Sequence, residues 1–235
     1  MQKLPVTERW LHYEISTFEY LIQLNLLSGR SFNNLSQYPI FPWILTDYTS
    51  KTINLKDPSV YRDLSKPVGA LNDDRFDGFK ERYDCMKEAE GMEGSLPSFL
   101  YGTHYSTPGY TLYYLVRTEP FTLFHIDLQA GCFDEYNRLF NSVEAAWQSS
   151  YSNPGDVKEL TPEWFCLPEF LVNSSHFPLN DTDVIRLQLF SYRRKLLVMW
   201  FYHLGQTMIR KSSLRSNAKL LKVNMFPPIF TTGLT

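Results

Sequence analysis

The feature that most constrains the fold is an apolar run at residues 38–45, YPIFPWIL, which two prolines interrupt. Its hydrophobicity is typical of a buried strand, but Pro39 and Pro42 lack the backbone N–H that a helix or a central strand requires. We therefore predict that this run passes extended through the interior without regular pairing. Buried backbone groups outside a ladder need other partners, because each orphaned group costs about 1–3 kcal/mol.

Polar side chains near the run are candidates for these partners. They are Asn25, Arg30, Asn33, Asn34, Gln37 and Asn54. We interpret them as partners of irregular backbone rather than as catalytic groups. Charged residues elsewhere are predicted to form buried or half-buried ion pairs that hold turns in place. These residues are Arg62 with Asp63, Arg117 with Glu119, and Asp156 with Lys158 and Glu159.

The composition favours one large folded domain. The 235 residues include 17 Phe, 15 Tyr and 5 Trp, so bulky rings should form much of the core. Cys85, Cys132 and Cys166 are odd in number and widely spaced, which argues against a disulfide framework and for a reducing compartment. The most apolar stretch, residues 196–202, is far shorter than the roughly 20 residues of a membrane span. We expect a cytoplasmic protein.

Apolar periodicity predicts several helices. The first should cover about residues 8–28, with Leu11, Ile15, Phe18 and Ile22 on one face, an N-cap at Thr7 and a left-handed residue at Gly29. Further helices are expected from Asp73 or Asp74 to the loop 91–94, from Thr107 to Val116, from Pro120 to Gly131, and from Asp134 to Trp147. Prolines should break residues 153–173 into turns and short helical pieces.

Ten short strings, in order along residues 10–173, carry a resemblance to a known family. They are FEYL (18–21), LN (24–25), SGRS (28–31), QYPIFPWIL (37–45), RDLSKP (62–67), YGTHYS (101–106), YLVR (114–117), EPFT (119–122), DVKEL (156–160) and LPEFL (167–171). With them the chain resembles the BEACH domains of the neurobeachin, lysosomal-trafficking-regulator and Alfy type. Our structural core motif comprises Asn25, Arg30, Asn33, Gln37, Tyr38, Pro39, Pro42, Trp43, Arg62, Lys66, His104, Glu119, Pro120, Lys158 and Glu159.

The resemblance implies a mainly α fold of the BEACH type, in which helices surround an irregular extended core. Such domains have no established catalytic activity or cofactor. They belong to very large proteins, usually between a PH-like domain and WD repeats, that act in vesicle trafficking, lysosome size control and autophagy. We assign residues 7–173 to the N-terminal portion of this domain.

Residues 174–235 depart from the family pattern. The family normally continues with helices that end in a WIDLIFGY-like stretch, whereas this segment is a divergent basic tail with nine Lys or Arg, two Asp and a net charge of +7. Residues 184–209 could form a helix with Leu187, Phe190 and Leu197 on one face. Two interpretations stay open: an altered transcript or gene prediction, and a genuine membrane-binding tail.

Sharper functional hypotheses receive little support from the sequence. His104 and Ser106 could form a nucleophile pair on paper, but no third orienting group is identified. His125, Asp127 and the three cysteines lack paired metal-ligand spacing, so we expect no metal site. No phosphate-binding glycine loop is present, and the well-matched part of the chain is acidic, which disfavours nucleotide and nucleic-acid binding.

The resemblance and the empty catalytic inventory together predict a non-catalytic scaffold or adaptor. We expect it to bind protein partners, together with a PH-like domain and WD repeats of the same parent chain, in vesicle trafficking and in lysosomal and autophagic membrane events. Peripheral association with endosomal and lysosomal membranes is part of this expectation. The alternatives are a signalling adaptor linked to sphingomyelinase activation and an uncharacterised hydrolase.

Overall fold

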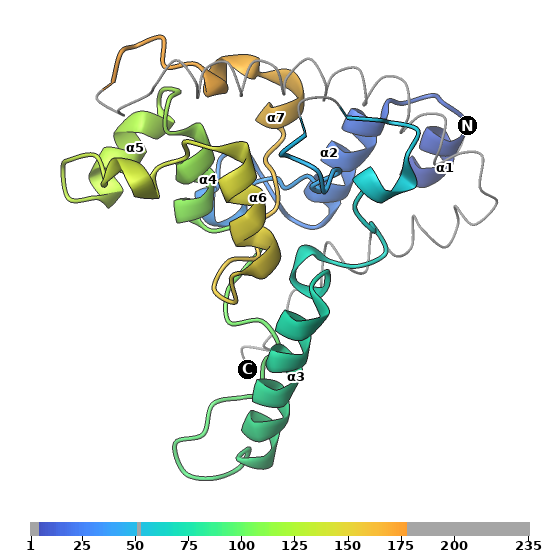
Figure 1. Cartoon of the computed structure of the whole chain (residues 1–235), viewed down its shortest axis with the longest axis vertical. Coiled ribbons are helices and arrows are strands. Elements are labelled where there is room, and N and C mark those ends of the chain that lie inside the picture. Colours follow the sequence, from blue (N-terminus) through green and yellow to red (C-terminus); the bar gives the residue numbers. More distant parts are fainter. Residues whose placement is uncertain (1–4, 51–52, 178–235) are drawn as a thin grey trace.

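The computed structural model describes residues 5–50 and 53–177, and Figure 1 shows helices joined by long extended segments in this part of the chain. The α-helices are α1 (Val6–Leu11), α2 (Thr17–Leu27), α3 (Asp73–Glu88), α4 (Pro108–Leu115), α5 (Phe121–Leu128), α6 (Val143–Ser152) and α7 (Glu163–Cys166). Single 3₁₀ turns lie at η1 (Leu35–Gln37), η2 (Pro58–Val60), η3 (Val68–Ala70), η4 (Tyr136–Arg138) and η5 (Pro168–Leu171). Only isolated β-bridges occur among the described residues, so the predicted mainly α fold is confirmed.

The predicted helix over residues 8–28 is wrong in one respect, because the chain breaks it into α1 and α2. Tyr13 adopts a positive φ of 59° at the break, and Ser16 begins α2 by accepting a hydrogen bond from the backbone N–H of Glu19. The two helices fold back on each other, and the rings of Trp10 and Tyr20 stack with centroids 4.4 Å apart. The apolar period continues across the break because both helices face the same small core.

The predicted caps of this region have different outcomes. Thr7 is inside α1 rather than at its N-cap, and its hydroxyl lies 3.3 Å from that of Tyr20. Gly29 follows α2 with φ of 80°, as predicted for a left-handed residue.

Helices α3, α4 and α6 each begin at a residue whose side chain accepts one of the first free backbone N–H groups. Asn72, rather than Asp73 or Asp74, caps α3 through the N–H of Arg75. Thr107 caps α4 as predicted, with Pro108 in the first turn. The helix predicted over residues 134–147 is wrong, because Ser142 caps α6 eight residues later and only η4 precedes it.

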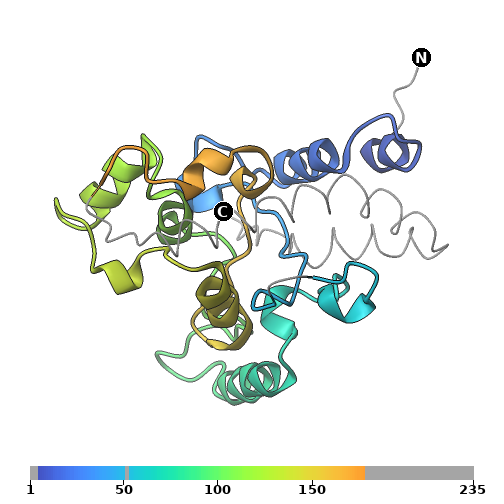
Figure 2. The ribbon, with the colours of Figure 1, turned by 45° about the horizontal axis from the view of Figure 1, so that its top comes forward.

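Trp43 lies at the centre of the main core and is 0% exposed. Its ring contacts those of Tyr48, Tyr114, Trp147 and Trp164, with centroids 5.4–6.5 Å apart. Bulky rings therefore form the middle of the domain, as the composition predicts. Helix α3 extends away from this body in Figure 1, and in Figure 2 it lies at the lower edge of the ribbon. No helix among the described residues combines the length and apolarity that crossing a membrane requires.

Candidate functional site

The run at residues 38–45 is buried along its whole length, as predicted. Phe41 and Leu160 exchange two backbone hydrogen bonds of 2.8 and 2.9 Å, and a second bridge joins Leu45 to Tyr61. The prediction that the run has no regular strand pairing is confirmed. It makes only two isolated antiparallel bridges among the described residues, one at Phe41 and one at Leu45. A bridge at Phe41 is available because the N–H of this residue lies between the two prolines.

The side chain of Asn25, on α2, forms hydrogen bonds with both the backbone N–H and the backbone carbonyl of Ile40. Its Oδ1 accepts the Ile40 N–H at 2.8 Å, and its Nδ2 donates to the Ile40 carbonyl at 2.9 Å. The same Nδ2 donates to the carbonyl of Leu21. The buried Asn25 side chain thus replaces a neighbouring strand for one residue of the run.

We expect Asn25→Ala to lower the free energy of unfolding by about 2–4 kcal/mol, because it leaves the N–H and the carbonyl of Ile40 buried without partners. Urea denaturation followed by circular dichroism measures the change. Asn25→Asp is the matched control: it keeps the acceptor for the N–H and loses the donor. Equal stability of wild type and Asn25→Ala would contradict the proposed role of this amide.

Arg30 supports the start of the run from the loop after α2. Its Nη1 donates to the Tyr38 carbonyl at 2.9 Å and also to the hydroxyl of Ser106. Burial lowers the pKa of Arg30 to about 10, so the guanidinium stays charged at neutral pH. The Ser106 hydroxyl in turn donates to the carbonyl of Ser36 at 3.2 Å. Arg30 therefore connects the run to the loop that precedes α4.

Glu159 and Arg62 form a fully buried ion pair beside Trp43. Both Glu159 oxygens accept from the guanidinium, at 2.7 and 2.8 Å, and Oε2 also accepts the backbone N–H of Trp43 at 3.1 Å. Arg62 donates a further bond to the Lys66 carbonyl at 3.1 Å. The indole N–H of Trp43 donates to the Lys158 carbonyl at 3.0 Å. Side-chain and backbone groups of two segments, residues 60–66 and 157–160, thus form hydrogen bonds with the run.

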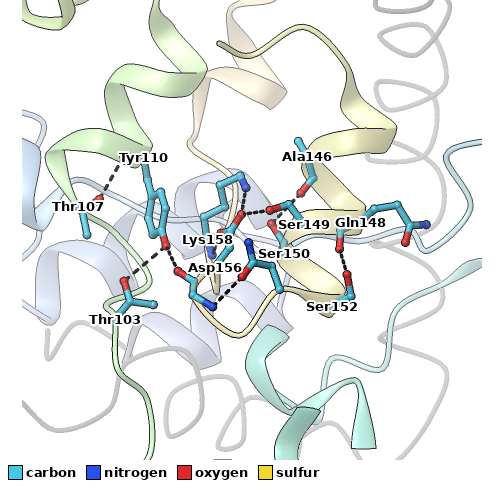
Figure 3. A network of polar contacts seen from close by, with 12 residues as sticks. Thr103, Thr107, Tyr110, Ala146, Gln148, Ser149, Ser150, Ser152, Asp156 and Lys158 are labelled. Atoms are coloured by element: carbon cyan, nitrogen blue, oxygen red, sulfur yellow. Dashed lines mark hydrogen bonds and ion pairs between the residues drawn. The ribbon is translucent and has the colours of Figure 1, made fainter. Parts of the chain in front are cut away.

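A second buried ion pair joins Lys158 to Asp156, and Figure 3 shows the polar network around it. The ammonium also lies 5.2 Å from the ring centroid of Tyr113, and the Ser149 hydroxyl donates to Asp156 at 2.6 Å. Burial lowers the pKa of Lys158, and the neighbouring carboxylate opposes that change. The buried ion pairs predicted for residues 156–159 are confirmed. Arg62 also takes part in a buried ion pair, as predicted, and its partner is Glu159. Asp63 of the same string is exposed and accepts the backbone N–H of Ser65.

Two buried polar residues belong to the same system and were missed by the sequence analysis. Arg75 of α3 donates to the carbonyls of Val68, Ser150, Asn153 and Asp156 at 2.6–3.3 Å. The Tyr38 hydroxyl donates a hydrogen bond of 2.7 Å to the carboxylate of Glu163 on α7. Burial, together with this neighbouring carboxylate, raises the pKa of Tyr38. Arg75 lies four residues before the buried Phe79 on its helix, and that spacing was the available signal.

Other members of the predicted core motif lie at the surface. They are Asn33, Gln37, Lys66, His104, Glu119 and Pro120. The prediction that Asn33 and Gln37 bond to the buried backbone is wrong, because both side chains are exposed. Asn25 and Arg30 donate to carbonyls of the run instead. Pro39 and Pro42 are buried in the run, and Pro120 directly precedes α5. Arg117 is buried while Glu119 is exposed, and the predicted pairing within this string stays a prediction.

The histidines and the serine of the sharper hypotheses lie in different surroundings. Ser106 directs its hydroxyl to a backbone carbonyl, and His104 is exposed. His125 is buried on α5, where its Nε2 accepts the backbone N–H of Asp134 at 3.5 Å and burial lowers its pKa. Across residues 5–50 and 53–177, no three His, Cys, Asp or Glu residues converge as metal ligands would.

The fold and its polar core define a helical domain wrapped around one extended, side-chain-supported segment. The Beige/BEACH domain matches residues 8–197, more than half of the chain, and the chain belongs to this family. The match continues beyond residue 173, where the strings of the sequence analysis end. The boundary between domain and tail stays a prediction, because residues from 178 onward lie outside the described part.

Named relatives agree with this assignment. The chain is 52% identical over 173 residues to BEACH domain-containing protein B of Arabidopsis thaliana, covering 74% of this chain and 6% of the relative. It is 51% identical over 171 residues to BEACH domain-containing protein lvsD of Dictyostelium discoideum, covering 72% and 6%. It is 47% identical over 184 residues to lvsE of the same organism, covering 78% and 8%. The chain thus spans less than a tenth of each relative's length.

Proposed function

We propose that this chain is a non-catalytic scaffold or adaptor module that acts by protein–protein interaction in vesicle trafficking and in lysosomal and autophagic membrane events. The observation that carries the proposal is how the charged residues of the family strings are used. Arg62, Lys158 and Glu159 are nearly inaccessible to solvent and bind one another, Asp156 or backbone. A carboxylate or amine so enclosed holds the fold together and has no access to a substrate.

The length of the relatives supports a module that works as part of a larger chain. Their names identify BEACH domain-containing proteins, and this sequence corresponds to 6–8% of them. A PH-like domain and WD repeats in the same parent chain would supply further binding surfaces, and endosomal and lysosomal membranes would be the place of action. Peripheral association through these partners is the expected mode of membrane contact.

Proximity labelling tests this proposal directly. The 235-residue chain, fused to a biotin ligase, should enrich endosomal and lysosomal membrane proteins over the ligase alone. The matched control is the same fusion carrying Glu159→Ala, which should lose the enrichment because the domain is destabilised. An identical set of labelled proteins for the chain and for the free ligase would contradict the scaffold proposal.

The hydrolase alternative has its own test at His104. Because this side chain is exposed, we expect His104→Ala to change the free energy of unfolding by less than about 0.5 kcal/mol. Partner labelling should also be unchanged. Loss of an esterase or amidase activity in this variant, with folding intact by circular dichroism, would favour the hydrolase over the scaffold.

A further inference from the structure

Helix α5 packs against α4 at one edge of the ribbon in Figures 1 and 2, and its outer side carries large apolar residues. Leu123, Phe124 and Leu128 are 57%, 44% and 54% exposed. The helical period places them on one side together with Asp127, whereas the buried residues of α5 lie on the opposite side. We refer to Leu123, Phe124, Asp127 and Leu128 as the α5 face. Large exposed apolar side chains gathered on one helix face are typical of a docking surface.

The charge on and around the α5 face is negative. Residues 119–135 contain neither Lys nor Arg, but they contain four acids: Glu119, Asp127, Asp134 and Glu135. Asp134 has a partner in Arg138, 3.5 Å away. Within the described part of the chain, no cation pairs with the other three acids.

The position of Asp127 along α5 strengthens this negative charge. Asp127 lies in the last turn of the helix, where the helix dipole favours a cation and an acidic side chain is unfavourable. His125 is the basic residue of this turn, but it is buried, and burial lowers its pKa, so it is uncharged at neutral pH. The end of α5 therefore presents a carboxylate beside apolar side chains. Such a surface favours an occupant that combines apolar and basic groups.

Two other kinds of occupant fit the α5 face less well. In a symmetric contact between two copies of the chain, the same acids would face one another, which disfavours the contact. An anionic membrane surface would be repelled, because helices that bind such membranes carry Lys and Arg around their apolar side. A helix of another protein fits better, since its residues at i, i+3, i+4 and i+7 form a stripe that can lie along α5.

We infer that the α5 face binds a basic amphipathic helix of a partner protein. The apolar side chains of this helix cover Leu123, Phe124 and Leu128, and one of its Lys or Arg residues pairs with Asp127. The small apolar area makes the contact weak and transient. The inference rests on the proposed scaffold function, for which it names one binding surface and the chemistry of its partner.

Fluorescence anisotropy of a labelled model peptide, titrated with the intact 235-residue chain, tests the inference. The probe is an amphipathic helix of about four turns, with Leu on one face and Lys on the other. Its matched control peptide has Glu in place of every Lys. The Lys peptide should bind saturably and at least about tenfold more tightly than the Glu peptide, because only the Lys peptide complements the acids of the α5 face.

Two variants of the chain locate the binding site on α5. Phe124→Glu with Leu128→Glu removes most of the apolar surface and should weaken binding of the Lys peptide at least about tenfold. Asp127→Lys reverses the charge of the face, leaves the apolar side chains in place and should weaken binding several-fold. Circular dichroism of each variant should match that of wild type, because all three replaced side chains are exposed.

Matched controls place the same changes on α3 and the loop that follows it. Met92→Glu with Leu96→Glu replaces two residues that are 67% and 68% exposed in that loop. Glu81→Lys makes the same change of charge as Asp127→Lys on the exposed side of α3. Both controls should bind the Lys peptide like wild type.

Equal binding of the Lys peptide by wild type and by both α5 variants would overturn the inference, and so would the absence of saturable binding. A molecular mass that rises with concentration in wild type, but not in Phe124→Glu with Leu128→Glu, would assign the face to a second copy instead. Cosedimentation with phosphatidylserine vesicles that the same double variant abolishes would assign it to a membrane. Either result would overturn the inference.

Proximity labelling separates failure of this inference from failure of the scaffold proposal. If the inference alone is wrong, the biotin ligase fusion carrying Asp127→Lys labels the same endosomal and lysosomal proteins as the wild-type fusion. If the scaffold proposal is wrong, the wild-type fusion labels only the proteins that the free ligase labels. Loss of a subset of labelled proteins in the Asp127→Lys fusion, but not in the Glu81→Lys fusion, is the result that we expect.

Discussion

Replacing Glu159 by alanine is expected to lower the free energy of unfolding by about 3–5 kcal/mol, because it leaves the buried guanidinium of Arg62 without its counter-charge. Both residues are almost inaccessible to solvent, so water cannot replace the lost carboxylate. The same substitution removes the acceptor of the Trp43 N–H, at the centre of the core. Urea denaturation followed by tryptophan fluorescence measures the effect.

The matched control for this prediction is Glu144→Ala, an exposed glutamate of α6, which should change stability by less than about 0.5 kcal/mol. A second variant separates loss of the pair from creation of an unpaired charge. Arg62→Met combined with Glu159→Leu removes both charges and should be more stable than Glu159→Ala alone. If Glu159→Ala unfolds at the same urea concentration as Glu144→Ala, the pair does not stabilise the core.

The buried, extended course of residues 38–45 was predictable because two prolines exclude the regular alternatives. The same reasoning identified Asn25 and Arg30, since an interior run without a ladder requires polar side chains nearby in sequence. It included Asn33 and Gln37 wrongly, because proximity in sequence does not tell which amides turn inward. The contact of Phe41 with Leu160 spans more than a hundred residues, and no local pattern indicates such a pairing.

Helix boundaries were likewise predictable where a local sequence signal marks them and not where a contact between distant residues sets them. Thr107 followed by Pro108 contains its own start signal, and α4 begins there. The break between α1 and α2 lies within a continuous apolar period, so periodicity alone predicted one helix. Stacking of Trp10 on Tyr20, a contact between the two helices, stabilises the turn and could not be read from spacing. The spacing of Arg75 to Phe79 could indicate that Arg75 is buried, but not its four carbonyl partners, which lie at residue 68 and within residues 150–156.

Trp43→Ala is expected to lower the free energy of unfolding by about 3–5 kcal/mol, because a fully buried indole leaves a large cavity. Loss of the indole N–H also orphans the Lys158 carbonyl, which adds about 1–3 kcal/mol. Urea denaturation should be followed by circular dichroism, since the substitution itself alters tryptophan fluorescence.

Two further variants separate the loss of the buried ring from the loss of the indole N–H and from the removal of an exposed ring. Trp43→Phe keeps a ring among Tyr114, Trp147 and Trp164 but lacks the donor, so it should lose less stability than Trp43→Ala. Tyr136→Ala removes an exposed ring and should change stability by less than about 0.5 kcal/mol. If Trp43→Ala behaved like Tyr136→Ala, the ring cluster could not be the centre of the core. The enclosed run would then depend on its polar contacts alone.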